Sequence, residues 1–181
     1  MHLLLLTGAL ALAASLAVPA SAGTARDARD VPVVDQAGTT FTLRDLRRPT
    51  AVVFIDLDCD DACTIAEGVF AKLAVALDKE HVDARLVTLT LDPEADPPIA
   101  MAAMARRFGA DATRWHWASG APANVKALMS AFHVVRVNRT EHSTFCYLLD
   151  AHGLPSRVIP LSTAADGELL AGLRALAHRR T

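Results

Sequence analysis

The chain has 181 residues, 52% of them hydrophobic, which is enough to bury one ordinary core and leaves little room for a second domain. Its formal net charge is −2, and the basic residues are scattered along the sequence. A nucleic-acid-binding protein gathers Lys and Arg on one face, so the composition argues against nucleic acid as a partner.

The N-terminus has the pattern of a secretory signal. Residues 3–18 form a run of apolar and small residues, and residues 20–22 follow as an Ala-x-Ala cleavage pattern. The run is shorter than the ~20 residues of a membrane-spanning helix. We therefore expect a signal peptide at 1–22, a linker at 23–30 and one domain at 31–181, exported or periplasmic and soluble after cleavage. No Lys or Arg precedes the run, so an uncleaved N-terminal membrane anchor is the alternative.

After the linker, strand patterns alternate with helix patterns. In chain order they predict a β-hairpin over 31–42, a strand at 51–55, a helix over 61–80, a strand at 85–91, a helix from about 96 to 108, a short strand at 115–117, a helix over 122–132, paired strands at 143–149 and 158–161, and a helix over 166–178. This order predicts an α/β, thioredoxin-like fold: a central mixed β-sheet with helices on both faces and an N-terminal β-hairpin.

Two cysteines stand where a buried strand gives way to a helix. Cys59 lies in the predicted loop and Cys63 in the first helical turn, where backbone N–H groups and the helix dipole favour thiolate. On a regular helix, residues four apart have Cβ atoms ~5–6 Å apart, which exceeds the ~3.5–4.5 Å of a relaxed disulfide. One metal ion bound to both sulfurs tolerates a wider separation.

The acidic residues around this pair also favour a bound cation, because they oppose a second negative charge on the thiols. They are Asp56, Asp58, Asp60 and Asp61. Soft thiolate ligands select Cu(I) or zinc over magnesium or calcium. Metal binding or redox chemistry is therefore expected at the pair, with a structural disulfide as the alternative in an oxidising compartment.

Two further residues are candidates for the same site. His142 lies just before the strand at 143–149, in a loop that this fold returns to the strand-to-helix junction. Asp92 ends the strand at 85–91 and emerges at the same edge of the sheet, where α/β proteins usually place their sites. Asp92 is a possible outer partner of the metal, or a turn residue before Pro93. Cys146 lies ~13 Å of extended chain from His142 and is predicted to be a buried core thiol.

Several of these segments together resemble the Sco/SenC family of copper proteins, which help assemble cytochrome c oxidase. They are Thr40-Phe41-Thr42-Leu43-Arg44-Asp45-Leu46, the strand leading to Cys59-x-x-x-Cys63, Thr90-Leu91-Asp92-Pro93-Glu94, and His142-Ser143 ahead of Tyr147-Leu148-Leu149-Asp150. Their order and spacing are similar to those of the family over nearly the whole chain after the signal. The sequence departs from the family after each cysteine, where Asp60 and Thr64 replace the usual prolines, and before the pair, where Ile55-Asp56-Leu57-Asp58 replaces an aromatic residue and a glycine.

The resemblance implies that Cys59, Cys63 and His142 bind copper, as Cu(I) and possibly also as Cu(II). It implies a metallochaperone that passes copper to the dinuclear centre of cytochrome c oxidase subunit II or to another cuproprotein client. Family members are also proposed to reduce client cysteines, which implies a periplasmic thiol reductant as a further partner.

Two rival functions follow from the same residues. A periplasmic thiol-disulfide oxidoreductase would attack with Cys59 or Cys63 and would not need His142. A structural zinc site would use Cys59, Cys63, His142 and Asp92. Metal preference and stoichiometry separate these functions.

Overall fold

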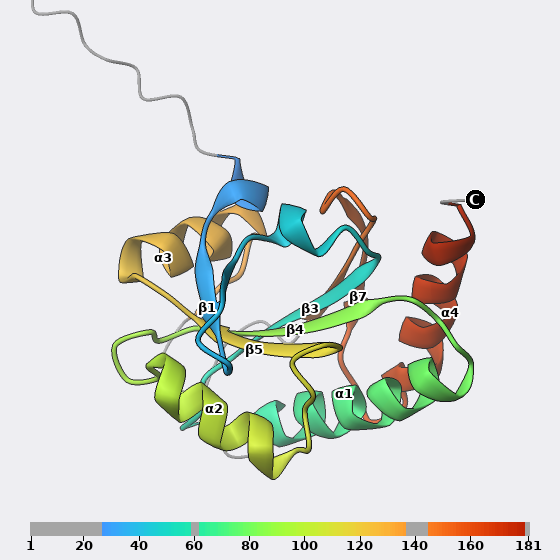
Figure 1. Cartoon of the computed structure of the whole chain (residues 1–181), viewed down its shortest axis with the longest axis horizontal. Coiled ribbons are helices and arrows are strands. Elements are labelled where there is room, and N and C mark those ends of the chain that lie inside the picture. The colour runs from blue at the N-terminus through green and yellow to red at the C-terminus, as the bar shows by residue number, and fades with distance from the viewer. Residues whose placement is uncertain (1–26, 59–61, 137–144, 180–181) are drawn as a thin grey trace, which may run out of the picture.

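A seven-stranded mixed sheet forms the centre of the chain in the computed structural model, which describes residues 27–58, 62–136 and 145–179 (Figure 1). Strand order across the sheet is β2-β1-β5-β4-β3-β6-β7, and the three inner strands β3, β4 and β5 are parallel. The strands are β1 (Val33–Asp35), β2 (Thr40–Phe41), β3 (Thr50–Ile55), β4 (Arg85–Thr90), β5 (Trp115–Ser119), β6 (Phe145–Leu149) and β7 (Pro155–Pro160).

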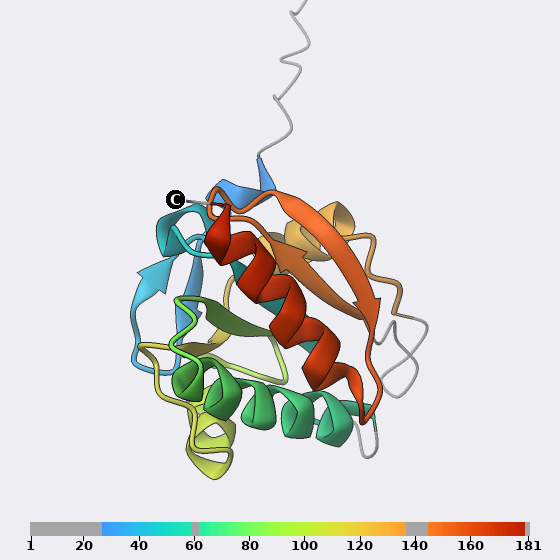
Figure 2. The same ribbon diagram turned by 90° about the vertical axis from the view of Figure 1, so that its right-hand side faces the viewer.

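Within the described ranges, four helices cover the two faces of this sheet. They are α1 (Ala62–Lys79), α2 (Pro98–Arg107), α3 (Pro122–Ala131) and α4 (Ala165–His178). The core of one face draws its buried residues from α1, α2 and α4, whereas that of the other draws them from α3, β1 and the 3-10 turn at Leu43–Leu46. Figure 2 shows α4 lying over the sheet beside α1.

β3 shows why the sequence folds this way. All six of its residues are buried, because Ala51, Val53 and Ile55 face the α1 side while Val52 and Phe54 face the α3 side. A continuous apolar run is what a parallel strand covered on both faces requires. β3 is therefore the central strand that leads directly into the cysteine motif.

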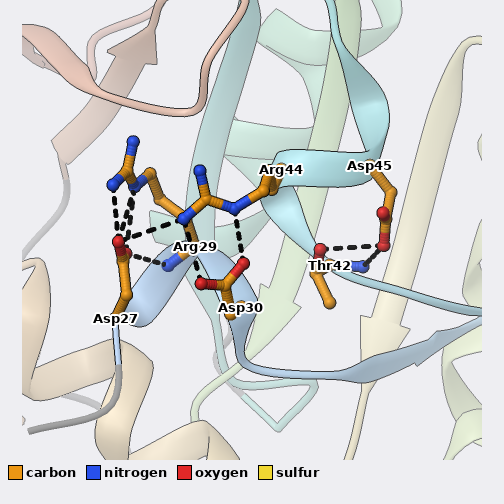
Figure 3. Close-up of polar contacts among 6 residues, drawn as sticks. All are labelled: Asp27, Arg29, Asp30, Thr42, Arg44 and Asp45. Atoms are coloured by element: carbon orange, nitrogen blue, oxygen red, sulfur yellow. Dashed lines mark hydrogen bonds and ion pairs between the residues drawn. The ribbon is translucent and has the colours of Figure 1, made fainter. Parts of the chain in front are cut away.

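The last residues of the predicted linker are structured rather than free. Asp27 caps a short 3-10 helix at Ala28–Asp30, and Arg44 reaches back across it. The Arg44 Nη2 atom donates to Asp30 Oδ2 at 2.9 Å and to Asp27 Oδ2 at 3.1 Å (Figure 3). The hydrogen bond and ion pair with Arg29 lower the pKa of Asp27.

The predicted fold class, the N-terminal hairpin and the order of elements are confirmed. β7 begins at Pro155 rather than near residue 158, because it is an exposed edge strand whose first residues carry no apolar pattern. The predicted signal peptide lies outside the described residues. Within the part of the chain described here, no helix is long and apolar enough to cross a membrane.

Candidate metal centre

The candidate site lies at the edge of the sheet where the parallel strands end. Ile55 of β3 pairs with Thr90 of β4, so the chain leaves both strands at the same level. From there β3 continues through Asp56 toward the cysteine motif, and β4 continues into Asp92. Ligands commonly bind at this carboxyl edge in α/β sheets.

Of the two motif cysteines, Cys63 has a described backbone. It is the second residue of α1, whose N-terminal turn exposes N–H groups and the positive end of the helix dipole. This location favours a charged thiolate. Cys59 lies outside the described residues, so the separation expected between the two cysteines stays a prediction.

His142 also lies outside the described residues, but the chain on either side of its segment is described. β6 runs antiparallel to β3 and pairs Cys146 with Val53, so its first residue, Phe145, lies near the end of β3. On the other side, Arg136 contacts Asp56 just beyond β3. Both ends of the segment that carries His142 therefore meet the sheet at the edge where the cysteine motif begins.

The side chain of Arg136 joins the ends of both strands. Its Nη2 atom donates to Asp56 Oδ2 at 2.6 Å and to Asp92 Oδ2 at 3.1 Å. A longer contact of 3.4 Å runs from Nη1 to the carbonyl of Leu91. The Asp56 side chain is fully buried, whereas those of Arg136 and Asp92 are 22% and 23% exposed. A buried carboxylate requires such a partner, because an unpaired charge is costly to desolvate.

A second carboxyl group completes this polar cluster. Asp96 Oδ2 accepts from Thr90 Oγ1 at 2.8 Å and from the Leu57 amide at 3.2 Å. Burial raises the pKa of Asp96, and the neighbouring Asp56 and Asp92 raise it further against the lowering effect of these two hydrogen bonds. We call the five side chains of Asp56, Thr90, Asp92, Asp96 and Arg136 the edge network.

Asp92 acts as the turn residue considered for it in the sequence, because its Oδ1 accepts from the Ala95 amide at 3.2 Å. Its Oδ2 pairs with Arg136 at the predicted edge of the sheet. Both carboxylate oxygens thus have partners within the protein, which disfavours Asp92 as a direct metal ligand. Its role as an outer partner of the metal stays a prediction.

Cys146 is a buried free thiol in the core between the sheet and the helices α1 and α4, as predicted. Burial raises the pKa of the Cys146 thiol far above its usual range. A thiol held in its neutral form is a poor nucleophile and a poor metal ligand. Cys146 is therefore a packing residue.

Sequence patterns did not single out Arg136. It is one charged residue among the valines Val134, Val135 and Val137, and its partner Asp56 is 80 residues away. Only the tertiary fold brings them together. A cavity of about 900 Å³ at the opposite edge of the sheet is lined by Arg47, Asp150 and His152 and holds none of the candidate residues.

The donor set suits a soft metal ion. Two cysteines and one histidine offer two thiolates and one imidazole, which suit Cu(I) or zinc. Among the described residues alone, no three His, Cys, Asp or Glu side chains form a metal-binding group. The ligands that the resemblance implies, the two cysteines of the strand-to-helix junction and the histidine of the segment between Arg136 and Phe145, stay a prediction.

The mixed sheet and the helices packed on its two faces define a domain with a thioredoxin-like fold. The family model described as SCO1/SenC matches residues 21–178, and the chain belongs to this family.

The chain is also similar to a curated sequence relative and to solved structures. An SCO2-like protein of Rickettsia felis is 27% identical over 135 residues, and the match covers 68% of this chain and 64% of that protein. The chain therefore spans just under two thirds of the length of this relative. The fold is similar to that of Bradyrhizobium japonicum ScoI with copper bound, with a TM-score of 0.69, 22% identity, and 81% and 96% of the two chains covered.

It is also similar to BsSco, which has a disulfide switch and is described as a member of the Sco family of cytochrome c oxidase assembly proteins. The TM-score is 0.71 and the identity 17%, with 81% of this chain and 91% of that chain covered.

Proposed function

We propose that this protein is an exported copper chaperone that binds Cu(I) through Cys59, Cys63 and His142. The observation that carries the proposal is the convergence of two chain segments at one sheet edge. α1 begins there with Cys63, and the segment carrying His142 leaves from Arg136 and returns at Phe145. Family membership and the copper-bound relative support the metal.

Loading and transfer of copper are ligand exchanges without net electron transfer. Each thiol releases its proton as the sulfur bonds to Cu(I), and the imidazole binds as its neutral form. Three ligands leave Cu(I) open to a further donor. A client thiolate then adds to copper as one protein ligand dissociates, and repetition of this step moves the ion.

The proposed client is the dinuclear copper centre of cytochrome c oxidase subunit II, or another cuproprotein. Support comes from the family, since BsSco belongs to the Sco family of oxidase assembly proteins. Export of the chain, with residues 1–22 removed as a signal peptide, would place it in the periplasm with such a client.

A thiol-disulfide reductase is the second candidate function, favoured by the helix N-terminus at Cys63 and by the disulfide switch of BsSco. In this reaction one thiolate attacks a client disulfide and forms a mixed disulfide, while the displaced client sulfur takes up a proton. The second cysteine, as thiolate, then attacks the mixed disulfide, forms the Cys59–Cys63 disulfide and releases the other client sulfur, which takes up a proton. Two electrons pass from Cys59 and Cys63 to the client, and His142 takes no part.

An anaerobic titration of the reduced protein with Cu(I) against a competing chelator tests the proposal. We expect one tight equivalent in the wild type and a loss of more than about tenfold in His142→Ala, because a direct ligand should matter at least as much as an outer partner. Cys146→Ala is the matched control and should keep wild-type affinity, since Cys146 lies in the core.

A wild type that binds no copper would overturn the chaperone proposal. Equal affinity of the wild type and His142→Ala would remove His142 from the site. Reduction of an oxidised client peptide by both proteins at the same rate would then favour the reductase.

A further inference from the structure

Arg136 is the cation that joins the two chain segments leading to the proposed ligands. Asp56, its buried partner, lies three residues before Cys59. Arg136 itself lies six residues before His142 and is the last described residue of its segment. The 2.6 Å contact between them therefore connects the approach to the first cysteine with the approach to the histidine.

The same guanidinium also fixes the neighbouring strand. Asp92 follows β4, and its Oδ2 atom accepts from the same Nη2 at 3.1 Å. Two carboxylates from adjacent strand ends thus share one donor atom, and Nη1 contacts the Leu91 carbonyl. A planar guanidinium with several donors can hold such partners in one geometry, which a lysine ammonium does less well.

The charges of the edge network make this contact hard to replace. Asp56, Asp92 and Asp96 lie close enough to influence one another, and Arg136 is the basic residue bonded to two of them. Removal of the cation would leave Asp56 buried without its charge partner, a strongly unfavourable state. The contact is thus a strong constraint on where the chain at residue 136 meets the sheet.

We propose that Arg136 is a positioning residue for the copper site, which holds the start of the His142 segment against the strand ends that lead to Cys59. This inference rests on the proposed function, because it assigns Arg136 an effect on copper held by those ligands. Arg136 does not touch the metal in this account. It acts through Asp56, Asp92 and the position of the chain.

A double-mutant cycle on Cu(I) affinity tests the inference. The proteins are the wild type, Arg136→Gln, His142→Ala and the combined variant. We expect Arg136→Gln to weaken copper binding by about tenfold, the lower end of what outer partners of a metal site contribute. In the His142→Ala background the same change should have no further effect, because the ligand that Arg136 positions is gone.

Two further measurements separate positioning from general stability. The Cu(II) EPR spectrum of Arg136→Gln should shift toward that of His142→Ala, and Arg136→Lys should partly restore both spectrum and affinity. The matched control is Arg157→Gln, which removes an exposed 2.8 Å ion pair with Glu168 on β7 and α4. It should leave both readouts unchanged.

If Arg136→Gln does not fold, Asp92→Asn takes its place, since it leaves the buried Asp56 pair intact. It should weaken binding in the same direction, again only when His142 is present. If the wild type binds copper and these variants bind it with the same affinity, the inference about Arg136 is wrong and the proposed function stands. An equal loss with and without His142 would also overturn it. A wild type without tight copper would overturn the proposed function, and this inference with it.

Discussion

Glu67 lies one helical turn after Cys63 in α1 and is only 4% exposed. Burial raises the pKa of its carboxyl group to about 7, against the lowering effect of Arg107. None of the hydrogen bonds found among the described residues involves this side chain. A buried carboxyl group without a close partner holds its proton more tightly than in the unfolded chain.

The sign of the resulting pH dependence follows from proton binding. Between the ordinary value of 4.5 and about 7, the folded chain binds the Glu67 proton and the unfolded chain has lost it. The free energy of unfolding therefore falls as pH rises through this window and stays lower above it.

Glu67→Gln should remove this penalty, because the amide is uncharged at every pH. We expect the variant to be more stable than the wild type at pH 8, by up to about 3 kcal/mol, and similar at pH 4.5. Urea denaturation at both pH values measures the difference. Glu80→Gln, at an exposed ion pair with Arg174, is the control. An advantage of Glu67→Gln that is equal at both pH values would contradict the account.

At the scale of single residues, the sequence singles out the two cysteines as candidate ligands but gives no sign of the contacts of Arg136. The spacing of Cys59 and Cys63 after an apolar strand is a local signal, and so is the place of Asp92 at the end of the next strand. The role of Arg136 depends on a partner 80 residues away, and no local pattern encodes that contact.

Among the elements, α4 packs closely on the sheet at Gly172. A Cβ atom at this position would lie 2.4 Å from Cδ1 of Leu148 in β6, a buried core residue. The absence of a side chain thus lets the helix approach the strand. Gly167 lies in the first turn of the same helix, and a Cβ atom added there would have no other atom within 4 Å.

Gly172→Ala should therefore destabilise the protein although alanine favours helix. Overpacking costs about 1–3 kcal/mol, and the gain in helix propensity offsets up to about 1 kcal/mol of this. We expect a net loss of about 1 kcal/mol in urea denaturation. Gly167→Ala, the matched control, should be neutral or stabilising. A Gly172→Ala variant as stable as Gly167→Ala would show that Leu148 moves aside without cost.

Most elements were predictable because their burial follows a simple period. Residues 51–55 of β3 are all apolar, and the buried residues Leu169, Leu173 and Leu176 of α4 recur at helical spacing. The sequence pattern predicts a start of β7 that is three residues too late, because the first four residues of the strand are exposed. Only their pairing with β6 makes them a strand. The short helix at residues 28–30 depends on Arg44, a tertiary contact that the linker composition does not reveal.

For the whole molecule, topology explains the site better than any one motif. The parallel pairing of β3 and β4 brings their carboxyl ends together, and antiparallel β6 returns the chain to the same edge. The described segments that flank the proposed donors, which lie 80 residues apart in sequence at Asp56 and Arg136, thereby meet at one edge of the sheet. Membership of the SCO1/SenC family fits this arrangement.

In the proposed site, two cysteines and one histidine bind a single copper ion. X-ray absorption at the copper edge, on the reduced protein loaded with one equivalent of Cu(I), counts the ligands directly. The account predicts two sulfur ligands and one imidazole nitrogen, with the nitrogen lost in His142→Ala. A copper ion coordinated by sulfur alone in the wild type, or one without sulfur ligands, would contradict it.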